Sequence, residues 1–137
     1  MVNNEKYILY TDGACIGNPG QMGIGCAIYN NNKLVKTISE KAGFGTNNEA
    51  EYLAMIEGLK ATTEYNPKMI FVFSDSQLVV NQVNGEWKIK KSHLEKLCEE
   101  IFEIINKNKN ICFEINWISR NYNKIADNLA SSAIGHN

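Results

Sequence analysis

The fold is decided in the stretch Lys6-Tyr7-Ile8-Leu9-Tyr10-Thr11-Asp12-Gly13-Ala14-Cys15-Ile16-Gly17-Asn18-Pro19-Gly20. The apolar and aromatic residues before Asp12 predict a β-strand that ends at this carboxylate. A carboxylate at the end of a core strand is costly to bury unless a cation compensates its charge. The apolar run 69–73 ends in the same way, in Ser74-Asp75-Ser76. Two strands that each end in a carboxylate predict a shared cation and a metal-dependent active site.

Length and composition indicate an ordinary globular protein, with 137 residues of which 44% are hydrophobic and 21% charged. This length suits one domain over residues 1–137, and no apolar run approaches the roughly 20 residues of a membrane span. Residues 1–6 lack the basic-then-apolar order of a signal peptide, so we expect a cytoplasmic protein. Four scattered cysteines and two histidines form no zinc-binding pattern. The net charge of -1 excludes a generally basic nucleic-acid binder but leaves room for a local basic groove.

Local signals predict the element order β-β-β-α-β-α-α-β-α. Three antiparallel strands come first, and two further strands follow between helices; the predicted strands are 6–11, 21–29, 33–42, 69–73 and 111–118. Capping signals start the first three helices, at Thr46-Asn47-Asn48-Glu49, Ser74-Asp75-Ser76-Gln77 and Ser92-His93-Leu94-Glu95. A fourth helix is predicted over about 122–134 from its apolar spacing. The sequence therefore predicts an α/β fold with a five-stranded mixed sheet flanked by helices.

Two more carboxylates are predicted to project from helices toward the same crevice, because ligands of open α/β sheets bind outside the carboxyl ends of strands. Glu51 lies early in the first predicted helix, and Asp127 lies in the last one. Four converging carboxylates would repel one another and raise their pKa values. Two Mg²⁺ ions about 4 Å apart would remove that conflict and assist phosphoryl displacement. Mg²⁺ prefers carboxylate oxygens, which matches a site without histidine or cysteine ligands.

Four motifs in order resemble ribonuclease H, type 1, over essentially the whole chain: Tyr10-Thr11-Asp12-Gly13-Ala14-Cys15 with Gly17-Asn18-Pro19-Gly20, Thr46-Asn47-Asn48-Glu49-Ala50-Glu51, Ser74-Asp75-Ser76-Gln77, and Asn123-Lys124-Ile125-Ala126-Asp127. The resemblance implies a ribonuclease H-like fold and cleavage of the RNA strand of RNA–DNA hybrids with two Mg²⁺ or Mn²⁺ ions, leaving a 5′-phosphate and a 3′-hydroxyl. It implies an acidic quartet made of Asp12, Glu51, Asp75 and Asp127. In the family the first of these bridges the metals, and the second also contacts a 2′-hydroxyl.

The same resemblance implies positions that contact the substrate. Asn18, Asn48 and Gln77 match residues that contact minor-groove edges or sugars of the hybrid. Thr46 matches a residue that holds a DNA phosphate, a role that fits a helix N-terminus but competes with capping the helix. We expect a monomer that needs no protein partner and no membrane.

The chain departs from many bacterial members in two places. Arg120 stands where they carry a histidine, as in archaeal-type members, and is predicted to make a planar phosphate contact in catalysis. A surface arginine is the alternative. The long basic protrusion is missing, so Trp87, Lys88 and Lys90 are predicted to form a reduced DNA-strand groove. A half-buried tryptophan beside solvated lysines is the alternative.

Two other functions remain open at this level. The missing protrusion permits broader specificity that includes double-stranded RNA. A non-catalytic nucleic-acid-binding domain on the same fold would require a broken acidic set, whereas all four carboxylates are present.

Overall fold

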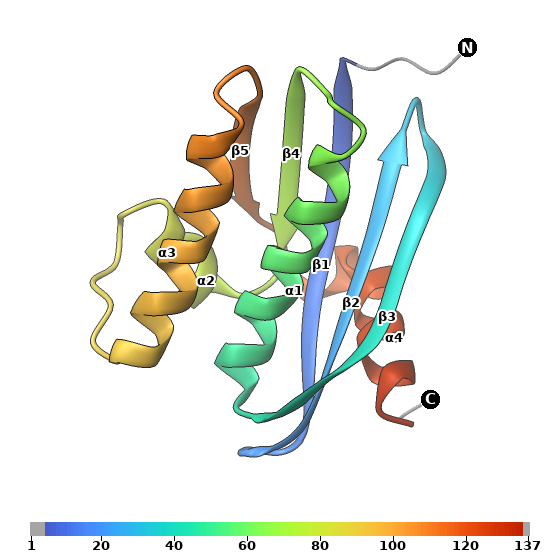
Figure 1. Cartoon of the computed structure of the whole chain (residues 1–137). Helices are drawn as coiled ribbons and strands as arrows, with labels where there is room; N and C mark the ends of the chain where they lie inside the picture. The colour runs from blue at the N-terminus through green and yellow to red at the C-terminus, as the bar shows by residue number, and fades with distance from the viewer. Residues whose placement is uncertain (1–4, 136–137) are drawn as a thin grey trace.

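One mixed sheet carries the fold, with its strands in the order β3-β2-β1-β4-β5 (Figure 1). The computed structural model describes residues 5–135. Its strands are β1 (Lys6–Gly17), β2 (Gly20–Asn30), β3 (Lys33–Gly45), β4 (Met69–Ser74) and β5 (Cys112–Trp117). The first three strands pair antiparallel, whereas β4 is parallel to both β1 and β5. The predicted five-stranded mixed sheet, three antiparallel strands followed by two parallel ones, is confirmed.

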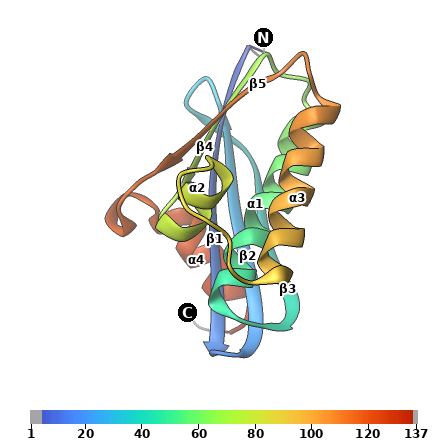
Figure 2. The ribbon, with the colours of Figure 1, turned by 90° about the vertical axis from the view of Figure 1, so that its left-hand side faces the viewer.

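The helices cover the two faces of this sheet unequally. The helices are α1 (Asn47–Thr63), α2 (Gln77–Val83), α3 (Ser92–Lys107) and α4 (Lys124–Ala133), and a 3-10 turn, η1 (Arg120–Tyr122), precedes α4. Figures 1 and 2 show α1 and α3 on one face of the sheet and α4 on the other. No helix within residues 5–135 is long and apolar enough to cross a membrane.

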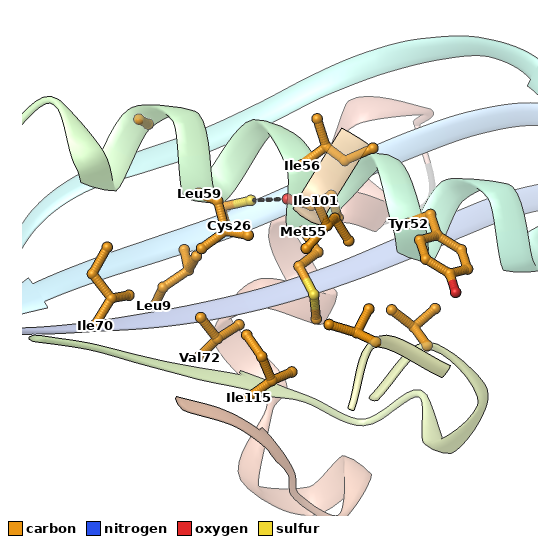
Figure 3. Close-up of a cluster of buried hydrophobic side chains, with 14 of the residues drawn as sticks. Leu9, Cys26, Tyr52, Met55, Ile56, Leu59, Ile70, Val72, Ile101 and Ile115 are labelled. Atoms are coloured by element: carbon orange, nitrogen blue, oxygen red, sulfur yellow. Dashed lines mark hydrogen bonds between the residues drawn. The ribbon is translucent and has the colours of Figure 1, made fainter. Parts of the chain in front are cut away.

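The main core lies between the sheet and the α1–α3 layer (Figure 3). Apolar side chains of the three inner strands pack there against α1, and Ile101 of α3 closes the layer. The side chains of Leu9, Met55, Leu59 and Val72 are fully buried. Burial of each such side chain contributes about 1.5–3 kcal/mol, so this layer holds α1 firmly against β1. The position of α1 matters because Glu51 lies in its second turn.

Strand β1 continues past Asp12, which corrects the prediction that this carboxylate ends the strand. Pairing of β1 with β2 runs from Ile8 opposite Tyr29 to Gly17 opposite Gly20. Pairing of β1 with β4 stops earlier, at Thr11 opposite Ser74. Asp12 is therefore the first residue of β1 that has lost its β4 neighbour, and its side chain lies at the open carboxyl edge of β4.

The turn and capping signals were mostly confirmed. Thr46 caps α1 with the predicted capping box, and Ser76 caps α2 by accepting a hydrogen bond from the backbone of Val79. The residues Asn31 and Asn32, in the turn between β2 and β3, have positive φ angles of 53° and 63°.

Two helix starts differ from the prediction. The capping box at Ser92 is wrong, because α3 begins at that residue and its N-cap, Lys91, makes no side-chain hydrogen bond. The last helix begins at Lys124 rather than near 122, because Arg120–Tyr122 forms the 3-10 turn η1. The predicted phosphate-binding arginine, Arg120, is the first residue of this turn and therefore lies outside the helix that carries Asp127.

Candidate active site

Three carboxylates gather at the edge where β4 ends. Oxygen atoms of Asp12, Glu51 and Asp75 all lie within 4.8 Å of one another. They come from three different elements, namely β1, α1 and the segment between β4 and α2. A cleft of about 330 Å³ opens onto them and is also lined by Asn47 and Arg120. The predicted convergence of these three residues on one crevice is thus visible in the structure.

Close packing at Gly13 places Glu51 beside Asp12. A Cβ atom at Gly13 would overlap the backbone of Ala50 and Glu51, so only glycine lets the start of α1 approach β1 this closely. The Gly13 backbone N–H donates a hydrogen bond of 2.8 Å to Glu51 Oε1. Strand and helix are therefore joined at the residue that follows Asp12.

Asp75 is held by the chain around it. Its backbone carbonyl accepts a hydrogen bond from the indole N–H of Trp117, with a distance of 3.2 Å. On the other side, the amide of Asn123 acts on its carboxylate and opposes the rise in its pKa. The Ser76 N–H donates to Ser74 Oγ at 3.1 Å, which shapes the turn from β4 into α2. These contacts fix the third carboxylate from both its backbone and its side chain.

Asp127 lies outside the cluster of three but beside it. It occupies the first turn of α4, and its side chain contributes to raising the pKa of Asp12. Helix α4 approaches the sheet over Gly25, the β2 residue opposite Asp12, where a Cβ atom would overlap the α4 backbone at Ala126 and Ala130. A second close approach, on the opposite face from α1, therefore brings the fourth carboxylate to the site.

Burial, assisted by mutual repulsion, raises the pKa values of Asp12, Glu51 and Asp75. Asp12 is 5% exposed, and burial raises its pKa from 3.8 to about 10, with further contributions from the charges of Glu51 and Asp75. Burial and the charge of Asp75 raise the pKa of Glu51 from 4.5 to about 8, opposed by the Gly13 hydrogen bond and Arg120. Burial also raises the pKa of Asp75. Such a site binds protons unless a cation replaces them, and an all-carboxylate donor set fits a divalent ion such as Mg²⁺.

The residues predicted to contact sugars, minor-groove edges or a DNA phosphate do not themselves line this cleft. Asn18 Oδ1 accepts a 3.1 Å hydrogen bond from the Asn47 N–H, which ties the β1–β2 turn to the start of α1. Thr46 Oγ1 accepts from the Glu49 N–H at 3.2 Å, so its capping role is present. Asn48 is half-buried in the first turn of α1, whereas Gln77 is exposed at the start of α2.

The predicted basic segment lies between α2 and α3. Trp87 is 47% exposed, and Lys88 and Lys90 are exposed beside it. None of the three lines the carboxylate cleft, so the segment is separate from the acidic cluster. Its contact with a DNA strand stays a prediction.

Sequence reasoning assigned no role in the site to three residues that the structure places there. Trp117 ends the short strand β5, and no local signal indicates its contact with Asp75. Asn123 was part of the last motif, but its contacts depend on residues far away in the chain. Asn47 was likewise noted only as part of a capping box, although it lines the cleft.

A mixed five-stranded sheet with a carboxylate cleft at the end of β4, approached by helices from both faces, defines a ribonuclease H-like α/β domain. The family described as reverse transcriptase-like matches residues 10–133. Ribonuclease H of Caldanaerobacter subterraneus is 36% identical over 150 residues, covering 96% of this chain and 93% of that protein. This chain belongs to the ribonuclease H family.

Other relatives are longer, and solved structures agree with the fold. The chain is 33% identical to a bifunctional protein of Mycobacterium tuberculosis over 94% of its own length but spans only 35% of that protein. RNase H1 of the archaeon Halobacterium salinarum has a TM-score of 0.88 and 30% identity, covering 94% of this chain and 97% of that one. LC11-RNase H1, solved in complex with an RNA/DNA hybrid, has a TM-score of 0.85 and 34% identity, covering 93% and 96%.

Proposed function

We propose that this protein is an endoribonuclease that hydrolyses the RNA strand of RNA–DNA hybrids and leaves a 5′-phosphate and a 3′-hydroxyl. The observation that carries the proposal is the clustering of Asp12, Glu51 and Asp75 within 4.8 Å in a cleft. Membership of the ribonuclease H family supports the reaction, and the hybrid bound to the similar LC11-RNase H1 supports the substrate.

Two Mg²⁺ ions are the proposed cofactors, and Mn²⁺ is expected to substitute for them. Asp12, Glu51 and Asp75, whose oxygen atoms lie within 4.8 Å of one another, would hold the ions together with Asp127, which influences the pKa of Asp12. When bound, the ions would activate a water and stabilise the leaving oxygen of an in-line displacement. The carboxylates themselves would give up their protons to bind the ions, since a ligand carboxyl must be ionised. No side-chain general base is required in this scheme.

Recognition of RNA would depend on its 2′-hydroxyl, the group that distinguishes RNA from DNA. We propose that Glu51 contacts that hydroxyl and that Asn18, Asn48 and Gln77 contact sugars or minor-groove edges. Thr46 lies at the N-terminus of α1, where backbone amides favour a DNA phosphate. Arg120 lines the cleft and is proposed to hold an RNA phosphate through its planar guanidinium group.

The segment between α2 and α3 is proposed to contact the DNA strand. Trp87 would pack on a sugar or base, while Lys88 and Lys90 neutralise phosphates. This segment is short, running only from the end of α2 at Val83 to the start of α3 at Ser92. Its shortness favours a second candidate activity, cleavage of double-stranded RNA as well, because less of the DNA strand would be inspected.

One set of assays tests both candidates. Hybrid, double-stranded RNA and double-stranded DNA of one sequence are incubated with the wild type and with Asp75→Asn in Mg²⁺, and the product ends are analysed. We expect hybrid cleavage with 5′-phosphate ends by the wild type alone. Glu99→Gln, on the exposed side of α3, is the matched charge-removal control and should cleave as the wild type does. Hybrid cleavage by Asp75→Asn at the wild-type rate would contradict the site assignment.

Location and assembly are further proposals. The cysteines within the described residues are all free thiols, which supports a reducing compartment such as the cytoplasm. We propose that residues 1–137 act as a single catalytic domain and as a monomer. Light scattering across a range of concentrations tests the monomer directly.

A further inference from the structure

Asn123 is a buried polar residue in an exposed segment. It lies between η1 and α4 and is 1% exposed, whereas the neighbouring Tyr122 is 78% exposed and Lys124 is also exposed. Burial of an amide is costly unless its hydrogen bonds are made. The contacts of this side chain therefore carry information about its role.

Asn123 contacts the segments that carry three of the carboxylates, namely Asp12, Asp75 and Asp127. Its Nδ2 donates a 2.9 Å hydrogen bond to the carbonyl of Thr11, the residue before Asp12 and 112 positions away in the chain. The same side chain also acts on the Asp75 carboxylate, where it opposes the rise in the pKa of that group. Its backbone carbonyl accepts a 3.0 Å hydrogen bond from the Asp127 N–H.

A fourth contact joins Asn123 to the turn before it. The Asn123 N–H donates to the carbonyl of Arg120 at 3.1 Å, which closes η1. One residue thus contacts the segments of three carboxylates and of the arginine proposed to bind phosphate.

An asparagine is chemically suited to this position. Its amide has two donor hydrogens, one for a carbonyl and one for a carboxylate, and it adds no charge to a site that is already strongly acidic. An aspartate here would lack both donors and repel Asp75, and an alanine would leave the Thr11 carbonyl without its partner. The donor geometry, rather than polarity alone, is what the site uses.

We propose that Asn123 is a positioning residue that sets Asp75 and Asp127 at the correct separation from Asp12 for metal binding. The inference rests on the proposed function, since it assigns a role within that same site. Residues that orient metal ligands typically change metal affinity or activity by about 10–100-fold when they are removed. Asn123 would act before substrate arrives, so its loss should affect metal binding and turnover more than hybrid binding.

The test compares Asn123→Ala with Asn128→Ala, which changes an exposed asparagine in the helix that follows Asn123. Mg²⁺ affinity is measured by calorimetry without substrate, and kcat and KM are measured on a hybrid. All measurements are made at a temperature well below the midpoint of thermal unfolding of the variant. For Asn123→Ala we expect Mg²⁺ affinity and kcat to fall by about tenfold or more, with KM changed by less than about threefold. Asn128→Ala should match the wild type in all three values.

The possible outcomes separate this inference from the proposed function. If the wild type neither binds Mg²⁺ nor cleaves the hybrid, the proposed function fails. If the wild type does both and Asn123→Ala keeps its metal affinity and kcat within about twofold, only the positioning role is overturned. If Asn123→Ala does not fold, Asn123→Ser, which keeps a small polar group, replaces it in the same measurements. Failure of both variants to fold would also overturn the proposal, because the residue would then serve the fold itself.

Discussion

Replacing Asp12 by asparagine should stabilise the metal-free protein while destroying its activity. The side chain is 5% exposed, and its pKa is raised from 3.8 to about 10 by burial and by Glu51 and Asp75. Between these two pKa values the native state binds a proton that the unfolded state does not, so stability falls as pH rises through this window. An asparagine binds no such proton and therefore avoids this loss.

The magnitude follows from the size of that window. A solution pH of about 7 lies roughly three units above the pKa of Asp12 in the unfolded chain. At 1.36 kcal/mol per unit, this difference corresponds to a loss of about 4 kcal/mol in the free energy of unfolding. The new amide must find hydrogen-bond partners in a buried site, and an unpartnered group costs about 1–3 kcal/mol. We therefore expect Asp12→Asn to raise the free energy of unfolding by about 1–3 kcal/mol at about pH 7 without divalent ions.

Urea unfolding with a chelator at several pH values between about 5 and 9 measures this effect directly. The wild type should lose stability as pH rises, and Asp12→Asn should lose less. In saturating Mg²⁺ the difference in free energy of unfolding between the variant and the wild type should become smaller or change sign. The reason is that the ions bind and stabilise the native wild type but not the variant. Hybrid cleavage by the variant should be undetectable, and Glu99→Gln should behave as the wild type throughout. An Asp12→Asn protein that is less stable than the wild type without metal, or that still cleaves, would refute the reasoning.

Three further variants probe the packing of α1, the cleft arginine and the basic segment between α2 and α3. Gly13→Ala should lower the free energy of unfolding by about 2 kcal/mol or more, because its Cβ atom overlaps the α1 backbone, and calorimetry should show weakened Mg²⁺ binding. Arg120→Ala should lower kcat far more than it weakens hybrid binding; a change in binding alone would make the arginine a simple phosphate anchor. Joint replacement of Lys88 and Lys90 by alanine should reduce the slope of log affinity against log salt by about 1–2, and an unchanged slope would exclude a phosphate contact.

Local signals in the sequence predicted those parts of the fold that depend on near neighbours. The capping box at Thr46 and the left-handed turn at Asn31 and Asn32 were confirmed because each depends on a few adjacent residues. The capping box at Ser92 was wrong, although its pattern was equally good, because α3 starts one residue too early for the hydroxyl to cap it. A capping motif indicates that a helix starts nearby, whereas tertiary packing decides at which residue it starts.

Long-range pairing explains what the sequence could not provide. Nothing within residues 6–20 shows that β1 keeps its β2 partner after losing β4, yet this difference places Asp12 at an open edge. The hydrogen bond between Asn123 and Thr11 spans 112 positions and has no local signature. The sequence indicated which residue types form the site, and the contacts that orient them emerge only from the assembled sheet.

The unfavourable charge at Asp12 results from the close packing of one helix on each face of the sheet. Gly13 lets α1 bring Glu51 from one face, and Gly25 lets α4 bring Asp127 from the other, so both helices converge on a single strand position. Neither approach would be tolerated with a larger side chain, and together they concentrate negative charge that only protons or a cation can offset. Stability without metal and affinity for metal are therefore opposed at this position. Substitutions that relieve the repulsion should stabilise the fold, and the same substitutions should weaken the site.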